Sequence, residues 1–213
     1  MNKSLNLELQ VIPNTDRLSR AFFSSKKEVV IENLFAPTRR TFQEGLGIPI
    51  EVSTNEYGQF PRGDILISYT TREEFDRRTE IISEFNMIRA FYLSFSKRDF
   101  PGAELNWRKV LGHSRENNIF IFSGLPKMFA LRYPKERTDL EKYCTFQGHV
   151  LLHELGHTFG LEHASYRDIR QGTTDIMSQG SSYDCYKWGR YDFSKEDKER
   201  IAKRMSEGWS DKK

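Results

Sequence analysis

The sequence predicts a mixed α/β (α+β) fold, in which helices back a sheet and a smaller, irregular part follows at the C-terminus. Segments with strand character come first and alternate with segments of helical character. A histidine-rich helical segment follows, and the chain after His163 has few regular patterns before a last helix. A length of 213 residues suits one domain, or one domain that a cleft divides into two lobes. We place the division between residues 1–163 and 164–213.

Apolar residues that alternate with polar ones, or form short runs between Gly and Pro, predict the strands. These strands are residues 5–12, 48–54, 64–70, 88–95 and 117–124. Residues 24–44 have helical character, and Pro37 is expected to bend or split that helix. Near the C-terminus, Ser194 is expected to cap a helix that has Asp197 at its third position.

Composition excludes several classes of protein. The net charge is only +3, and basic and acidic residues are interleaved, as on solvated helix faces. This pattern gives no indication of a nucleic-acid partner. No apolar run approaches the ~20 residues that a membrane-spanning helix needs. We therefore expect a soluble protein, and expect it to be a monomer.

The N-terminal segment and the cysteines bear on the compartment. The first residues, MNKSLNLELQVIPN, lack the basic start and apolar stretch of a secretory signal. We therefore expect a cytoplasmic protein or a secreted protein that has been processed. Cys144 and Cys185 are too few for a disulfide scaffold and lack zinc-binding CxxC spacing. Two free thiols and a single bridge both remain open.

Residues 149–163, HVLLHELGHTFGLEH, hold four of the five histidines of the chain. We expect Thr145 to cap a helix over residues 146–159. His153 and His157 are four residues apart, so their side chains lie about 40° from each other around the helix. Both imidazoles can therefore reach one metal ion. Glu154 is expected to lie beside the metal, where it can hold and deprotonate a metal-bound water.

Gly160 is expected to end this helix. Glycine adopts positive φ without steric cost, so it can stop the helix and reverse the chain. His163, three residues later, can then return to the same ion as His153 and His157. Three neutral nitrogens with an open fourth position are typical of a catalytic zinc site, whereas structural sites are closed.

Two other histidines offer alternatives. His149 is four residues before His153 and could replace His163 as third ligand, although a straight helix would spread the three residues over about 12 Å. We expect His149 instead to pack under the sheet or to bond a neighbour. His113, in the loop-like stretch KVLGHSRENN, is expected to be a surface histidine, with a substrate contact as the alternative.

The stretch HELGHTFGLEH, residues 153–163, resembles the signature of the metzincin clan of zinc metallopeptidases. Fourteen residues after His163, Met177 in TTDIMSQG resembles the Met-turn, a tight turn whose methionine lies beneath the metal without binding it. The resemblance implies a zinc-dependent metallopeptidase, an endopeptidase rather than an exopeptidase. It further implies one catalytic Zn²⁺ with ligands His153, His157 and His163, and Glu154 as general base and acid.

The resemblance also implies a fold and a substrate site. A metzincin has a twisted, mostly parallel sheet, two long helices, and one antiparallel edge strand that binds extended peptide by strand addition. We expect residues 117–124 to be that edge, with Ile119 and Ile121 in contact with substrate. The segment after the Met-turn, including Gln179 and Tyr183, is expected to line the substrate pocket. The last helix resembles the ending of the matrixins.

The chain also departs from the subfamilies it resembles most, the matrixins and the archaemetzincins. Archaemetzincins have a cysteine directly after the third histidine, and Ala164 in that place argues against a second, cysteine-bound zinc ion. Astacins and serralysins have a tyrosine two residues after the Met-turn methionine, where this chain has Gln179. Two alternative functions remain open: a zinc-binding module without turnover, and a zinc hydrolase of a non-peptide amide.

Overall fold

The computed structural model describes residues 4–56, 59, 62–71, 111–115, 117–123, 139–163, 175–177 and 192–207. The elements within these ranges are β1 (Leu5–Val11), α1 (Arg17–Phe22), α2 (Lys27–Arg39), the π-helix η1 (Arg40–Gly45), β2 (Ile50–Asn55), β3 (Ile65–Thr70), β4 (Gly112–Arg115), β5 (Asn118–Phe122), α7 (Leu140–Thr158) and α10 (Lys195–Ser206). The strand predicted for residues 88–95 lies outside the described residues.

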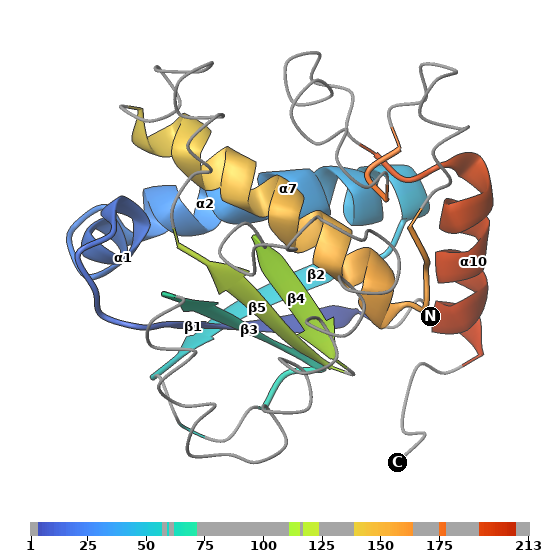
Figure 1. The fold of residues 1–213 in the computed structure, drawn as a ribbon. Coiled ribbons are helices and arrows are strands. Elements are labelled where there is room, and N and C mark those ends of the chain that lie inside the picture. Colours follow the sequence, from blue (N-terminus) through green and yellow to red (C-terminus); the bar gives the residue numbers. More distant parts are fainter. Residues whose placement is uncertain are drawn as a thin grey trace, which may run out of the picture.

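The five strands form one sheet in the order β2-β1-β3-β5-β4. All neighbouring strands are parallel except β4, which runs antiparallel to β5 at one edge. Helices α2 and α7 lie on the same side of this sheet (Figure 1). The mixed α/β fold with one antiparallel edge strand, predicted from the sequence, is therefore confirmed.

The edge strand is not the predicted one. Residues 117–124 contain β5, which pairs with β3 on one side and β4 on the other, so the prediction that this segment is the edge is wrong. Within the described residues the antiparallel edge strand is β4, and β2 forms the other edge. The side chains of Ile119 and Ile121 are fully buried. They belong to the core, and the prediction that they contact substrate is wrong as well.

The apolar core lies between the sheet and helices α2 and α7. Alternate residues of three adjacent strands face the same side and are in register, for example Leu9 opposite Ile67 and Ile67 opposite Ile119. All three are fully buried. Each such side chain contributes roughly 1.5–3 kcal/mol relative to an exposed one. This layer supports α7 from below.

The other face of β1 is polar. The Glu8 carboxylate accepts hydrogen bonds from Asn55 Nδ2 (2.9 Å) and from the backbone N–H groups of Arg62 (2.6 Å) and Gly63 (3.0 Å). Burial alone would raise the pKa of Glu8, but these hydrogen bonds outweigh burial, so the pKa lies below its usual value. Glu8 therefore ties the connection between β2 and β3 to β1, the strand that lies between them.

Helices α2 and α7 approach each other closely at Gly148. A methyl group at this position would clash with the backbone of Leu34 and lie 3.0 Å from Pro37 Cδ. Pro37 lies inside α2, and the helical segment continues beyond it as η1. In place of the single helix predicted over residues 24–44, the structure has an α-helix followed by a π-helix.

Helix α7 begins earlier than predicted. Asp139 caps it by accepting hydrogen bonds from the backbone N–H groups of Glu141 (3.0 Å) and Lys142 (3.3 Å). Thr145, the predicted cap, lies inside the helix and donates its hydroxyl to the Glu141 carbonyl (2.9 Å). A threonine hydroxyl can form this hydrogen bond inside a helix or cap the start of a helix, and sequence alone does not distinguish the two roles.

The C-terminal helix agrees with its prediction. Ser194 caps α10, and its hydroxyl accepts a hydrogen bond from the Asp197 N–H (3.1 Å). Much of the chain between His163 and this helix lies outside the described residues, so the division into 1–163 and 164–213 stays a prediction. Cys144 is a buried free thiol, and Cys185 lies outside the described residues. None of the described helices is long and apolar enough to cross a membrane.

Candidate metal centre

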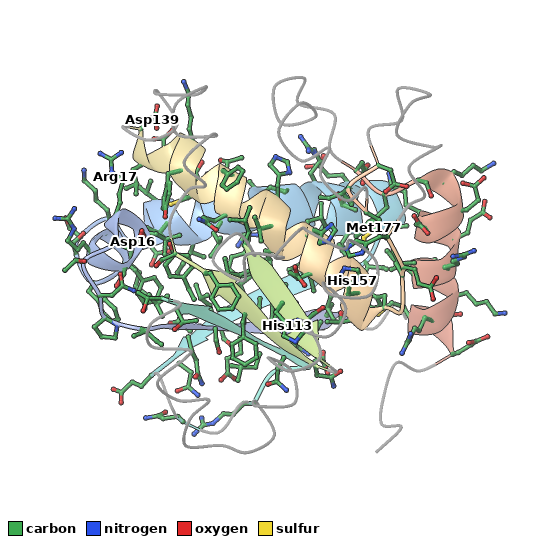
Figure 2. All side chains as sticks on the ribbon, viewed as in Figure 1. Asp16, Arg17, His113, Asp139, His157 and Met177 are labelled. Carbon is green, nitrogen blue, oxygen red and sulfur yellow. The ribbon has the colours of Figure 1, made fainter. Side chains whose placement is uncertain are left out.

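Three histidines converge at the C-terminal end of α7. The Nε2 atoms of His153 and His157 are 3.2 Å apart, those of His153 and His163 are 3.2 Å apart, and those of His157 and His163 are 3.1 Å apart. Figure 2 shows His157 near the end of α7, above the sheet edge where His113 lies. Among the described residues, this is the cluster of His, Cys, Asp and Glu side chains whose ligand atoms could hold a metal ion.

A tight chain reversal brings the third histidine back to the helix. Gly160 has φ 77°, its N–H donates to the His157 carbonyl (2.8 Å), and the Leu161 N–H donates to the Gly156 carbonyl (3.0 Å). These two bonds form a Schellman motif, the usual way for a helix to end at a glycine. The predicted role of Gly160 is confirmed, and His163 follows directly on this turn.

Two of the three rings are oriented by backbone carbonyls. His153 Nδ1 lies 2.7 Å from the Ile176 carbonyl oxygen, and His157 Nδ1 lies 2.8 Å from the Leu161 carbonyl oxygen. Each neutral ring therefore donates its Nδ1–H and keeps a lone pair on Nε2, the arrangement of metal-ligating histidines. The turn that ends α7 thus both returns His163 and orients His157.

The donor set fits a zinc ion. Ligand nitrogens at about 2.0–2.1 Å from a tetrahedral zinc lie about 3.3 Å from one another, close to the distances found. Burial lowers the pKa values of His153 and His157, and partial burial with the two neighbouring histidines lowers that of His163 to about 4. The rings are therefore neutral at pH 7. The Nε2 atoms of His153 and His157 both carry lone pairs, so they cannot form a hydrogen bond with each other. A cation between the two nitrogens would be bound by both lone pairs.

Glu154 lies next to the first histidine, with its side chain buried against the sheet edge. Burial raises its pKa to about 7, although the nearby His157 and a hydrogen bond from the Ser114 side chain act in the opposite direction. A carboxyl group with a pKa near neutrality can both accept and release a proton. The structure thus provides a candidate general base beside the three histidines.

Met177 packs against this end of α7 at Gly156. Its side chain is fully buried, and its N–H donates to Asp175 Oδ1 (2.8 Å). A methyl group at Gly156 would clash with Met177 Sδ and lie 2.8 Å from Phe193 Cε1. The turn holding Met177 also supplies the Ile176 carbonyl that orients His153. Figure 2 shows Met177 beside α7, on the side of α10.

The other candidate residues, His149, His113, Gln179 and Tyr183, are not part of the histidine trio. His149 lies on α7 outside the converging trio, so the alternative in which it replaces His163 is wrong. Burial, together with the charge of Arg40, lowers the pKa of His149 to about 4. His113 belongs to strand β4 rather than a loop. Gln179 and Tyr183 lie outside the described residues.

Sequence reasoning missed the contribution of β4. Gly112 and Ser114 lie against Glu154, and neither was singled out from the sequence. The signal available was weak, because GHSR is short and contains no residue that favours strands. Only pairing with β5 identifies this segment as a strand.

The sheet order, the antiparallel edge and the two helices on one face define a fold of the archaemetzincin type. One solved structure that the chain resembles is the crystal structure of archaemetzincin from Methanopyrus kandleri. The two chains are 15% identical, the match covers 96% of each, and the TM-score is 0.51. At this identity the similarity shows the fold. No protein-family model matches the chain, and no curated protein matches its sequence.

Proposed function

We propose that the protein is a zinc-dependent metallopeptidase that hydrolyses peptide bonds. The observation that carries this proposal is the meeting of three Nε2 atoms within 3.2 Å of one another, beside a buried glutamate. A structural zinc site has no use for an unliganded carboxylate at its side, whereas a hydrolytic site does. The archaemetzincin-like fold supports the same class.

His153, His157 and His163 would hold one zinc ion, with a fourth position open. The ion, when bound, supplies acidity to a coordinated water and polarises a substrate carbonyl. The chain contributes the orientation of the ligands through the carbonyl groups of Ile176 and Leu161. A ligand set held in this way does not need to reorganise when the metal enters.

Glu154 would move the proton. Its carboxylate takes a proton from the attacking water as the water adds to the scissile carbonyl carbon. The same carboxyl group then gives that proton to the departing amine nitrogen, as the carbon–nitrogen bond breaks. The pKa of about 7 suits both directions of transfer near neutral pH.

The substrate would be an extended peptide that adds to the edge of the sheet. Because β4 is the antiparallel edge strand within the described residues, we assign this role to β4 in place of β5. Gln179 and Tyr183 would line the pocket beyond the scissile bond, and Met177 would provide the Met-turn beneath the metal. We propose endopeptidase action, a protein or peptide partner and a monomeric enzyme.

A random peptide library tests this proposal. We expect the purified protein with one equivalent of zinc to cleave internal bonds, 1,10-phenanthroline to abolish cleavage, and added zinc to restore it. The termini of the products report endo or exo action and the preferred side chains. A stoichiometric zinc protein that cleaves no peptide would contradict the proposal. Amide substrates would then separate a non-peptide hydrolase from a zinc-binding module.

A further inference from the structure

The carboxyl side chain of Glu154 lies directly on strand β4. A methyl group at position 112 would lie 2.7 Å from Glu154 Cγ and 2.9 Å from Glu154 Oε1. Contacts this short essentially never occur for a real Cβ, so a side chain at position 112 would push Glu154 away. Because Gly112 has no side chain, the Glu154 carboxyl group can occupy the space above this position of the strand.

Ser114 lies on the same side of the strand. Successive strand residues point to opposite faces, so Gly112 and Ser114 face one way and His113 the other. Their partners on β5 are Ile121 and Ile119, which are buried in the core beneath α7. Ser114 thus faces α7, on the side of the strand where Gly112 meets Glu154, and its hydroxyl side chain acts to lower the pKa of the Glu154 carboxyl group.

We propose that Ser114 is a positioning residue for Glu154, seated in the space that Gly112 leaves open on the edge strand. The serine hydroxyl donates to one carboxylate oxygen and fixes the rotation of the group. The other oxygen is then left to face the water beside the three histidines. This inference rests on the proposed function for its catalytic meaning, but the contact itself does not depend on activity.

Strand β4 has two roles in this arrangement. β4 is the edge at which an extended peptide would pair, and two of its residues, Gly112 and Ser114, lie against the candidate general base. A shift of β4 would move the carboxyl group of Glu154, whereas α7 carries the backbone of Glu154 together with that of His153 and His157. Ser114 therefore links the position of the carboxyl group to the strand.

Kinetics of three variants test this role. We expect Ser114→Ala to lower kcat about tenfold or more, the effect of losing a hydrogen bond to a charged group. KM, zinc content and the unfolding midpoint should stay unchanged. Ser114→Thr, which keeps the hydroxyl, should restore most of kcat. Ser53→Ala, an exposed serine on the opposite edge strand β2, is the matched control and should have no effect.

Crystal structures of the wild-type and Ser114→Ala proteins give a readout that needs no activity. We expect the Glu154 carboxyl group to leave its wild-type position, or to occupy several, once the hydroxyl is removed. An unmoved carboxyl group would overturn the proposal, as would a Ser114→Ala enzyme with kcat within twofold of wild type. If the wild type cleaves no peptide, the proposed function fails, and the crystal structures still decide the role of Ser114.

Discussion

The Nδ1 atom of His153 lies 2.7 Å from the carbonyl oxygen of Ile176, so a residue of the active helix and a turn 23 residues away are directly joined. The turn also contains Met177, whose sulfur packs against Gly156 on the same helix. Two contacts of different kinds, one polar and one apolar, therefore hold this turn under the histidines. The orientation of His153 depends on both.

Gly156→Ala should disturb this arrangement. The added methyl group would clash with Met177 Sδ and with Phe193, so the turn must shift and the Ile176 carbonyl must move with it. We expect zinc affinity to fall about tenfold or more, since partners of ligating histidines contribute 10–100-fold. Competition with a chromogenic zinc chelator measures the change.

Gly45→Ala is the control for that variant. Its methyl group would meet other atoms only at an ordinary contact distance of 3.7 Å, in η1. We expect its zinc affinity to match the wild type. Equal affinity in both variants would show that Met177 and its turn do not support the metal site.

Gly160→Ala should weaken both the fold and the metal site. A residue with a Cβ at φ 77° costs about 1–2 kcal/mol, and the methyl group would also clash with the Arg204 guanidinium. Because His163 follows on this turn, we expect zinc affinity to fall as well. Chemical denaturation and zinc competition measure the two effects.

Gly47→Ala separates the two effects. Gly47 has φ 66° and open space around its Cβ position, so the substitution carries a similar backbone cost in the connection between η1 and β2. We expect reduced stability with normal zinc affinity. A Gly160→Ala protein that binds zinc as well as Gly47→Ala does would refute the role of the turn in returning His163.

Glu154→Gln should abolish turnover and leave the metal in place. The amide keeps the shape of the side chain but cannot accept a proton, so we expect the rate of peptide cleavage to fall by at least about 10²-fold. Metal analysis should still give one zinc per chain. Cleavage at the wild-type rate in the zinc-loaded variant would exclude Glu154 as the general base.

His149 should make the metal-free protein less stable in acid. Burial and Arg40 lower its pKa in the fold to about 4 from a usual value of 6.5. The unfolded chain therefore binds the proton first, and the free energy of unfolding falls as pH drops from 6.5 towards 4. The loss amounts to at most about 3 kcal/mol.

Urea denaturation of the metal-free wild type and His149→Gln over this pH range checks the effect. Gln does not titrate, so the variant should lose less stability between pH 6.5 and 4, while protonation of the metal ligands affects both proteins alike. Parallel curves for the two proteins would rule out a buried, neutral His149.

Local signals in the sequence predicted the centre of this site well. The spacing of His153 and His157 follows from the helix, and the reversal at Gly160 follows from its lack of a Cβ, so both could be read without a structure. Tertiary pairing decided what the sequence could not. β4 becomes a strand because it pairs with β5, and that pairing places β5 inside the sheet. Ile119 and Ile121 are buried because they lie in the core with apolar residues of α7. The helix starts at Asp139 instead of Thr145, and aspartate is the better N-cap residue of the two.

Zinc K-edge X-ray absorption of the protein with one equivalent of zinc tests the central claim most directly. We expect three imidazole nitrogens at about 2.0–2.1 Å, a light fourth ligand and no sulfur. A sulfur ligand, fewer than three imidazoles, or zinc that does not bind at one ion per chain would contradict it.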